Sequence, residues 1–286
     1  MNYIFYPGCL SLTEQYTYEI SSVNVLKYLG VNFMYPENIN CCGLPLRNLN
    51  SFGWLYLSTR LIAALENYDK PCILLCNWCH VSITCTMKIL RKREDLLSWV
   101  NELLSKEDLR YEGKLKFKHI IQFLYEDIGL EKLKTYLKIN FNGLKFSIHP
   151  GCLYFRPRDI GRPDDSHNPH ILLDLVKILG AETQLSTDCC GWAIYKINAD
   201  VGLTLAGNRI KLASGTDGIV LACPHGGEML DTHYSDACKT VGFNGSIPVL
   251  YYTQILGLSM GIEPKDLALN INKSPVNKLL SKLFDT

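Results

Sequence analysis

The sequence has no long hydrophobic run and no large excess of charge of either sign. Its richest apolar stretch, 249–262, is interrupted by Tyr, Thr, Gln and Ser and is shorter than the roughly 20 residues of a membrane-spanning helix. The formal net charge is +1 and 20% of the residues are charged, so the composition gives no electrostatic footprint for nucleic acid. We therefore expect a chain with no transmembrane segment and no nucleic-acid partner.

The beginning of the sequence also lacks the features of a secretory signal. Met1 leads directly into the apolar segment 2–6, without a basic start, a long apolar core or a small-residue cleavage site. This predicts a cytoplasmic, reducing setting, where the 12 cysteines favour metal or redox chemistry over a disulfide framework. With 286 residues, the chain is long enough for one large domain or two moderate ones.

What the sequence does contain is a doubled cysteine pattern. The triplet Cys-Cys-Gly at 41–43 recurs at 189–191, and Pro-Gly-Cys at 7–9 recurs at 150–152. Adjacent cysteines can bind neighbouring metal atoms of one cluster, but they cannot easily form a relaxed disulfide with each other. The glycine after them permits a positive φ and a close approach of the backbone. The repeat therefore indicates two related metal or redox sites.

Both halves have the same predicted order of elements: strand, Pro-Gly-Cys, helix, strand, Cys-Cys-Gly, helix, strand, cysteine. The predicted strands are 3–6, 31–34, 72–76, 144–148, 182–185 and 218–222. The predicted helices are 13–29, 55–65, 81–90, 171–179 and 199–213. The linking region 96–137 is predicted to be largely helical, with the charge run 91–95 as a solvated helix end, and the residues from 248 onward are predicted to form two or three short helices.

A duplication of half the chain is too long for a solenoid repeat. It predicts an α/β fold, with two similar α/β domains related by pseudo-twofold symmetry and extra linking and C-terminal helices. We place the domains at 1–143 and 144–286. In such sheets, ligands collect beyond the carboxyl ends of parallel strands, which is where the pattern places the cysteines.

The first half offers five thiolates, and these are the candidate ligands Cys9, Cys41, Cys42, Cys76 and Cys79. Zinc would need only four ligands in a tetrahedral shell. Five sulfur ligands that include an adjacent pair suit a polynuclear iron-sulfur centre better, since several iron atoms must be anchored. A zinc site, or cysteines that only pack in the core, are the alternatives.

This pattern resembles that of the CCG-domain family over nearly the whole chain, and the two-copy arrangement is similar to the B subunit of heterodisulfide reductase. In that family a complete motif, a cysteine, then Cys-Cys-Gly, then Cys-x-x-Cys, holds a noncubane [4Fe-4S] cluster at a site where a disulfide is cleaved. The resemblance implies that the five N-terminal cysteines hold such a cluster. It also implies two partners, a ferredoxin-like subunit that exchanges electrons with this chain and a flavin-bearing subunit. The chain has no Cys-x-x-Cys-x-x-Cys run or Gly-x-Gly-x-x-Gly site of its own.

The second half departs from this pattern at one position. Cys152, Cys189, Cys190 and Cys223 match, and the resemblance makes them ligands of a second iron-sulfur cluster whose type the pattern leaves open. The fifth position is Gly226, which cannot bind iron. Three consequences are open: a four-cysteine cluster of an ordinary or smaller form, a noncubane cluster with another ligand, or a site reduced to a scaffold.

Other cysteines and a histidine lie near the pattern. His225 could bind iron, as histidines do in Rieske centres, but we prefer the interpretation that it donates a hydrogen bond to sulfur. Cys238 follows in the next helical segment and is a further thiol within the second half. Cys72 and Cys85 are predicted to be packing residues, one in a buried strand and the other in the helix after the first cysteine set.

Two further groups are candidates for acting on a substrate. His149 precedes Cys152 as Tyr6 precedes Cys9, and it could give a proton to a departing thiolate or simply be a turn histidine bonded to backbone. The arginines of the loop after Cys152 could clamp a carboxylate or phosphate of a substrate, or form a solvated loop. These are Arg156, Arg158 and Arg162, of which the first two are our substrate-binding candidates.

The sequence therefore predicts the iron-sulfur subunit of a heterodisulfide reductase-like complex, an oxidoreductase that cleaves or forms a disulfide or sulfane sulfur bond. Its electrons would be exchanged with the ferredoxin-like partner, and its substrate would be a thiol and disulfide or a protein-bound sulfur. The variant found in sulfur oxidisers is favoured by Gly226. The alternatives are a CCG subunit of a lactate- or glycolate-type oxidoreductase and a non-catalytic electron-relay subunit.

Overall fold

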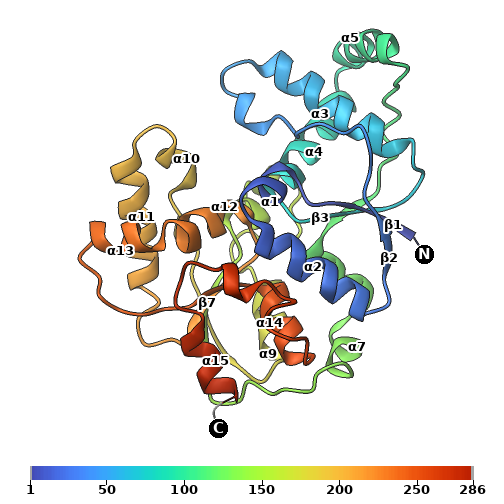
Figure 1. Cartoon of the computed structure of the whole chain (residues 1–286). Helices are drawn as coiled ribbons and strands as arrows, with labels where there is room; N and C mark the ends of the chain where they lie inside the picture. Colours follow the sequence, from blue (N-terminus) through green and yellow to red (C-terminus); the bar gives the residue numbers. More distant parts are fainter. Residues whose placement is uncertain (1, 285–286) are drawn as a thin grey trace.

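Two parallel four-stranded sheets, each with helices around it, make up the computed structural model, which describes residues 2–284 (Figure 1). The first sheet has the order β2-β1-β3-β4 and the second the order β6-β5-β7-β8, so corresponding strands occupy corresponding places. The strands are β1 (Asn2–Tyr6), β2 (Asn32–Met34), β3 (Cys72–Leu74), β4 (Phe117–His119), β5 (Lys145–His149), β6 (Glu182–Leu185), β7 (Gly218–Leu221) and β8 (Val249–Tyr251).

Helices connect the strands and surround both sheets. The α-helices are α1 (Cys9–Thr13), α2 (Tyr16–Tyr28), α3 (Ser51–Glu66), α4 (Asn77–Leu90), α5 (Glu94–Leu104), α6 (Ile120–Phe123), α7 (Leu130–Lys134), α8 (Cys152–Phe155), α9 (Ile171–Lys177), α10 (Trp192–Tyr195), α11 (Ala199–Lys211), α12 (Pro224–Gly227), α13 (Tyr234–Thr240), α14 (Tyr252–Ser259) and α15 (Asn277–Phe284). The short 3-10 and π segments are η1 (Leu44–Leu46), η2 (Ser105–Glu107), η3 (Leu124–Ile128), η4 (Arg158–Ile160), η5 (Glu228–Thr232) and η6 (Leu269–Ile271).

One of the two middle strands in each sheet, β3 or β7, has no polar side chain along its whole length. β3 and β7 are buried at every position, as expected for parallel strands that are covered by helices on both faces. Phe5 of β1 pairs with Ile73 of β3, and Ile148 of β5 pairs with Val220 of β7. The predicted α/β fold with two similar parts is confirmed, and the six predicted strands are all present.

The fourth strand of each sheet was not predicted, and this corrects two expectations. β4 lies inside the region 96–137, for which we expected helix, and β8 lies just after residue 248, where we expected short helices to begin. Both strands have three residues and lead directly into a helix, α6 or α14. Three residues are too few to show an alternating pattern, so pairing with β3 or β7 decides their conformation.

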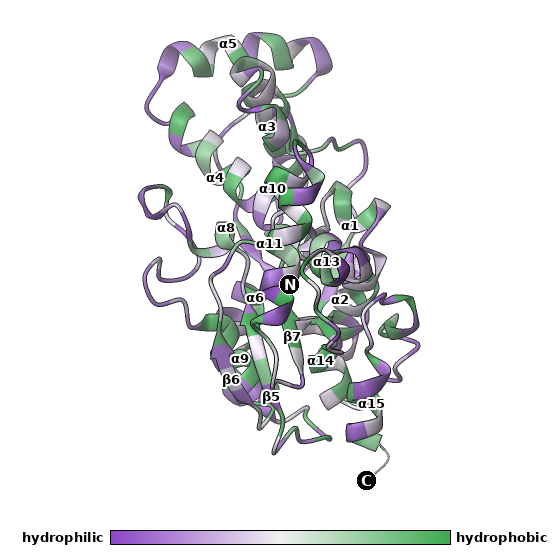
Figure 2. Ribbon diagram, turned by 90° about the vertical axis from the view of Figure 1, so that its left-hand side faces the viewer, coloured by the Kyte–Doolittle hydropathy of each residue, from purple (hydrophilic) through white to green (hydrophobic). Residues whose placement is uncertain are grey.

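The two halves pack directly against each other through α2 and α14. Tyr18 and Tyr251 stack with ring centroids 4.1 Å apart, and Ser21 and Thr253 share a hydrogen bond of 2.7 Å. One cluster of buried apolar side chains contains residues of both halves. In Figure 2, α3, α4 and α5 form one end of an elongated molecule and α15 lies at the other. The boundary between 143 and 144 stays a prediction.

No helix formed by residues 2–284 has both the length and the apolar character that crossing a membrane requires.

Candidate metal centre

The five cysteines of the first half lie beyond the carboxyl ends of their strands. Cys9 begins α1 three residues after β1 ends, and Cys76 is the N-cap of α4 just after β3. Cys79 follows in the first turn of α4, while the loop after β2 carries the adjacent pair Cys41 and Cys42. Because these strands are parallel, their carboxyl ends lie along one edge of the sheet. The topology therefore brings the five side chains to one place.

The thiols of these five cysteines contact one another in a row. The sulfurs of Cys9 and Cys41 are 3.5 Å apart. The thiol of Cys42 interacts with those of Cys41 and Cys79. Cys79 also interacts with Cys76, which completes the row. The structure thus brings together all five predicted ligands of the first half.

Glycine makes room for this row of thiols. Gly8 has a φ of 82°, and a Cβ at its position would lie 3.1 Å from the Cys79 sulfur and 3.2 Å from the Cys76 Cβ. Gly43, after the cysteine pair, has a φ of 71°. Residues other than glycine rarely adopt such a backbone angle. The glycines of Pro-Gly-Cys and Cys-Cys-Gly are therefore required by the backbone geometry. The sequence motif therefore has a direct steric cause.

The environment of the row favours thiolates at two of its members. Contacts with the thiols of Cys42 and Cys9 hold the pKa of Cys41 well below its ordinary value. Burial by itself raises the pKa of Cys76, but contacts with Cys79 and His225 outweigh it and hold that pKa well below the ordinary value. The same contacts raise the pKa of Cys9, Cys42 and Cys79, so the environment favours the thiolate, the form that binds metal, only at Cys41 and Cys76.

The four cysteines of the second half also lie beyond strand ends. Cys152 begins α8 after β5, and Cys223 is the N-cap of α12 after β7. The thiol of Cys190 lowers the pKa of Cys189 to about 6. Burial, followed by the charges of Cys223 and Cys189, raises the pKa of Cys152 to about 11. The four predicted ligands are therefore neighbours, with a direct thiol contact between Cys189 and Cys190.

His225 lies between the two cysteine sets. Its Nδ1 is 3.8 Å from the Cys76 sulfur and 3.9 Å from the Cys223 sulfur, and the side chain is buried. Burial opposes the charged form of His225, but the neighbouring Cys76 and the contact with Cys223 raise its pKa to about 10. This geometry matches the preferred interpretation of His225 as a hydrogen-bond donor to sulfur, and it adds that the donor faces one cysteine from each half.

Two tryptophans enclose His225, and sequence reasoning missed both. Trp78 stacks on the imidazole with centroids 4.6 Å apart and planes at 21°, while Trp192 meets it edge-on at 4.2 Å and 87°. Trp78 lies between Cys76 and Cys79, at the position equivalent to His225 itself. Their place beside the cysteine motifs was the available signal. The two rings cover His225, whose side chain is buried.

His149 lies against the position where the fifth cysteine of the second half is missing. A Cβ on Gly226 would be 3.5 Å from His149 Cδ2 and 3.7 Å from its Nε2. Burial, together with the charge of Arg209, lowers the pKa of His149 to about 3, so the ring is neutral at ordinary pH. Its Nδ1 is buried and makes no hydrogen bond to any of the residues described. The role of His149 as a proton donor stays a prediction.

The arginines of the loop after Cys152 point in different directions. Arg156 and Arg158 are exposed, and the Arg156 guanidinium lies 4.9 Å from the centre of the Phe155 ring. Arg162 is partly buried and donates a hydrogen bond to the carbonyl of Leu153. The predicted substrate contacts of Arg156 and Arg158 stay predictions.

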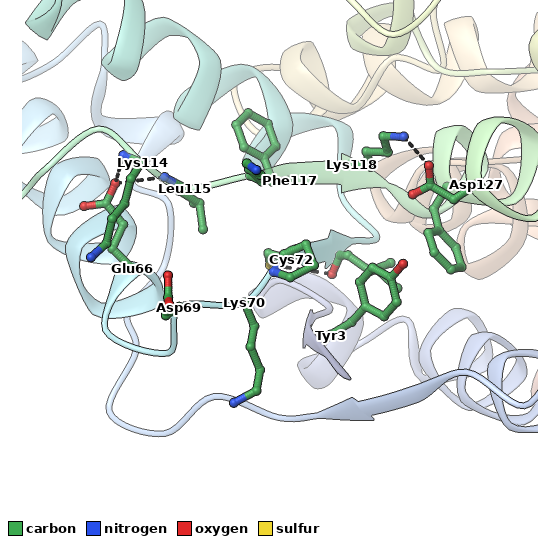
Figure 3. Close-up of a pocket in the computed structure, with 14 residues that line it drawn as sticks. Tyr3, Glu66, Asp69, Lys70, Cys72, Lys114, Leu115, Phe117, Lys118 and Asp127 are labelled. Carbon is green, nitrogen blue, oxygen red and sulfur yellow. Dashed lines mark hydrogen bonds and ion pairs between the residues drawn. The ribbon is translucent and has the colours of Figure 1, made fainter. Parts of the chain in front are cut away.

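The remaining cysteines are buried in secondary structure. Cys72 is part of β3, Cys238 is in α13, and Cys85 is in α4. The Cys85 sulfur accepts a hydrogen bond of 3.8 Å from Nη1 of Arg47. Cys72 also borders a cavity of about 900 Å³ at the amino-terminal ends of the first sheet's strands, away from the cysteine sets (Figure 3). Glu66 in that cavity accepts hydrogen bonds from backbone N–H groups, and Lys118 pairs with Asp127.

The donor set of the first half fits an iron-sulfur cluster. Within residues 2–284, no group of three or more His, Cys, Asp and Glu side chains is arranged to hold a single metal ion. The five thiols instead follow one another in a row, from exposed Cys9 and Cys41 to buried Cys76. Successive sulfurs in a row suit a group with several iron atoms, since each iron takes its own thiolate.

Comparison with known proteins defines the class to which this architecture belongs. The model of the CCG family, described as a cysteine-rich domain, matches residues 3–84 and again residues 146–231. The chain therefore belongs to the CCG family and contains the domain twice. This confirms the resemblance inferred from the cysteine pattern.

Individual relatives are similar along their whole length. A protein of Archaeoglobus profundus, described as similar to the B subunit of heterodisulfide reductase, is 28% identical, with 100% of this chain and 99% of that protein covered. The B subunit of the ferredoxin:CoB-CoM heterodisulfide reductase of Methanosarcina mazei is 28% identical, with 97% and 95% covered. The 8-methylmenaquinol:fumarate reductase membrane anchor subunit of Wolinella succinogenes is 27% identical, with 97% and 98% covered.

A solved structure shares the fold. The crystal structure of a hypothetical protein from Helicobacter pylori superimposes with a TM-score of 0.76 at 15% identity, and covers 96% of this chain. The chain spans 52% of that longer protein. At this identity the likeness concerns the fold alone.

Proposed function

We propose that this chain is the iron-sulfur subunit of a heterodisulfide reductase-like complex, an oxidoreductase that cleaves or forms a sulfur–sulfur bond. The observation that carries the proposal is the row of five thiols from Cys9 to Cys76 at the carboxyl edge of the first sheet. Relatives named for the B subunit of heterodisulfide reductases support it, because they are similar over nearly their full length.

The five thiols of the first half would hold a noncubane [4Fe-4S] cluster, and the four of the second half would hold a second iron-sulfur cluster. A bound cluster supplies the one-electron steps into which the two-electron chemistry of a disulfide is divided. In the reductive direction, a disulfide takes up two electrons and two protons and leaves as two thiols. The oxidative direction reverses this balance.

The residues around the sets define an entrance and an interior. Cys9 and Cys41 are exposed, so a disulfide or protein-bound sulfur can approach from their end of the row. Cys76, at the other end, is buried beside His225, which also faces Cys223 of the second set. Hydrogen bonds from His225 would stabilise negative charge on both sulfurs, and Trp78 and Trp192 cover that histidine.

The ferredoxin-like subunit would exchange electrons with this chain, and the flavin-bearing subunit would supply them to the ferredoxin-like one. Exposed apolar side chains beside the second cysteine pair support contact with the ferredoxin-like subunit there. Ile197 is 83% exposed and Val201 is 45% exposed. Leu205, 37% exposed, lies 3.1 Å from the Cβ position of Gly191, the glycine of the second Cys-Cys-Gly. A short distance from partner to cluster suits electron transfer.

A second candidate is a non-catalytic electron-relay subunit. The Wolinella succinogenes relative favours it, because its name places it in a fumarate reductase and not in a disulfide reductase. The two candidates differ in whether a thiol binds at the first cysteine set.

The test is anaerobic quantitation of iron and acid-labile sulfide, combined with EPR spectra of the oxidised protein with and without candidate thiols. The proposed function predicts iron and sulfide for two clusters and an oxidised-state signal that changes when thiol is added. Two ordinary cubane signals that ignore thiol would favour the relay subunit. Protein with bound zinc and neither iron nor sulfide would refute both.

A further inference from the structure

The amino-terminal edge of the first sheet borders a cavity, whereas the same edge of the second sheet is covered. The cavity, of about 900 Å³, contains Lys70 and Lys116 in its lining (Figure 3). The repeat defines the equivalent place in the second half, because Cys76 and Cys223 are equivalent and the strands before them pair in the same register. In this register, Lys70 corresponds to Asp217.

In the second half, the helix α15 covers this edge. Lys282 of that helix forms an ion pair with Asp217, the residue just before β7. Lys278 donates a hydrogen bond of 3.0 Å to the carbonyl of Ser246, three residues before β8. Leu279, between the two lysines, is 1% exposed and belongs to the cluster of buried apolar side chains that includes β7 and β8. An amphipathic helix therefore closes the amino-terminal edge of the second sheet.

The first half leaves the equivalent apolar residues partly exposed. Tyr3 and Phe117 line the cavity and are half-buried. Their equivalents in the second half, Phe146 and Val249, are both 0% exposed. Removing apolar surface from water is favourable, so the lining favours an occupant with apolar side chains. The second half shows that a helix fits at this place in the fold.

The charge at this edge is reversed between the halves. Lys70 stands at the position of Asp217, the residue that pairs with α15. Among residues 2–284, neither Lys70 nor Lys116 takes part in an ion pair. A helix with basic residues, such as α15, would be repelled from this edge, and a helix with acidic residues would be attracted to it.

The other charged side chains of the cavity do not cancel this positive charge. Lys114 and Lys118 pair with carboxylates of nearby residues. The two carboxylate oxygens of Glu66 accept hydrogen bonds from backbone N–H groups. Asp69, which is exposed, is the remaining carboxylate of the lining. One carboxylate therefore faces two lysines that have no ion pair of their own.

We propose that this cavity docks an amphipathic helix of a partner protein. Apolar side chains of that helix fill the cavity, and its acidic side chains pair with Lys70 and Lys116. The helix takes the place that α15 takes in the second half, with the charges exchanged. The inference goes beyond the proposed function and needs no bound cluster, because the cavity lies at the opposite end of the strands from the cysteines.

The experiment uses two fluorescent peptides with the sequence of residues 274–284 of this chain. One retains the two lysines of α15, and the other carries Lys278→Glu and Lys282→Glu. A covalent staple joins positions 277 and 281, which are exposed in α15 and one turn apart, so that both peptides are helical before they bind. Their binding to the full-length protein is measured by fluorescence anisotropy.

The acidic peptide should bind about tenfold more tightly than the basic one. Lys70→Glu in the protein should reverse this order, because it weakens binding of the acidic peptide and strengthens binding of the basic one. The matched control is Lys239→Glu, which reverses the charge of an exposed lysine of α13 in the other half. It should leave both affinities unchanged.

Three results would overturn the inference. An acidic peptide that does not bind, or binds no better than the basic one, would show that the cavity does not select an acidic helix. Equal effects of Lys70→Glu and Lys239→Glu would place the bound peptide elsewhere. Binding of decanoate, an apolar anion, that Lys70→Glu weakens while neither peptide binds, would assign the cavity to a small molecule. All three leave the proposed function standing, since that is tested by iron, sulfide and the response to thiol.

Discussion

The two halves of the molecule share one strand order but surround their cysteines differently. In the first half, five thiols follow one another from Cys9 to Cys76. In the second, four thiols are neighbours, and Gly226, at the position of the fifth, is bordered by His149 and Leu221. The strands carry the buried apolar residues, and the cysteines sit in the turns beyond them. The fold can therefore keep its core while the ligand set changes at one position.

The halves also meet at one pair of equivalent residues. Trp78 and His225 hold the same place in the two motifs and stack on each other. The histidine gives the second half a donor that reaches a sulfur of each set, at 3.8 Å and 3.9 Å. The two cysteine sites therefore share surrounding side chains and are not independent copies of one site.

The largest effect should come from breaking the complete set. Cys79→Ala removes the thiol that joins Cys42 to Cys76 in the row, so the first cluster should be lost and disulfide turnover should fall to background. Iron content and turnover with the partner proteins measure this. Cys85→Ala removes a buried thiol of the same helix outside the row and should retain both. Parent-rate turnover by Cys79→Ala would show that the first site is not catalytic.

Breaking the second set should have a smaller effect on the sulfur chemistry. Cys223→Ala should lose the second cluster's iron, while the thiol-responsive EPR signal of the first cluster persists. The reason is that the first set is the complete row of five thiols, whereas exposure does not separate the sets, since Cys152 and Cys189 are exposed as Cys9 and Cys41 are. Cys238→Ala, in α13, is the matched control. Loss of the thiol response in Cys223→Ala would instead assign the substrate to both sites.

The surface beside the second pair should matter for assembly. Ile197→Asp puts a charge on a side chain that is 83% exposed next to α10 and should weaken binding of the ferredoxin-like partner about tenfold, or about 1.4 kcal/mol. Leu212→Asp changes an apolar residue that is 57% exposed, just past the other end of α11, and should leave binding unchanged. Titration calorimetry with the purified partner measures both. Equal effects of the two variants would argue against this docking place.

The smallest effect should be on the reduction potentials of the two clusters, through His225, which lies between them. His225→Leu removes hydrogen bonds to Cys76 and Cys223, and such bonds to sulfur raise cluster potentials. Both potentials should fall by roughly 40 mV, the one-electron equivalent of about 1 kcal/mol. Redox titration followed by EPR measures this, with His233→Gln as the control. A shift confined to one cluster would contradict a bridging role for His225.

Much of this architecture was predictable from local pattern. The Pro-Gly-Cys and Cys-Cys-Gly motifs occur twice, and the glycines have steric reasons that apply wherever the chain turns beside a thiol. β4 and β8 could not be predicted, because three residues show no period and their conformation comes from pairing with β3 and β7. Trp78 and Trp192 were missed because nothing local to them shows that they meet around His225.

The sequence by itself determined the two-part α/β fold, the family and the cysteines that gather at each sheet. Repeats and hydrophobic patterns are local properties, so they can be identified from the sequence alone. Only the tertiary structure decided which half supplies what to the other. The contact of His225 with Cys76 joins positions 149 residues apart, and the hydrogen bond from Asn77 to the carbonyl of Pro150 joins positions 73 residues apart. Residues so far apart in the sequence come into contact because one half packs against the other, and no local sequence pattern predicts that packing.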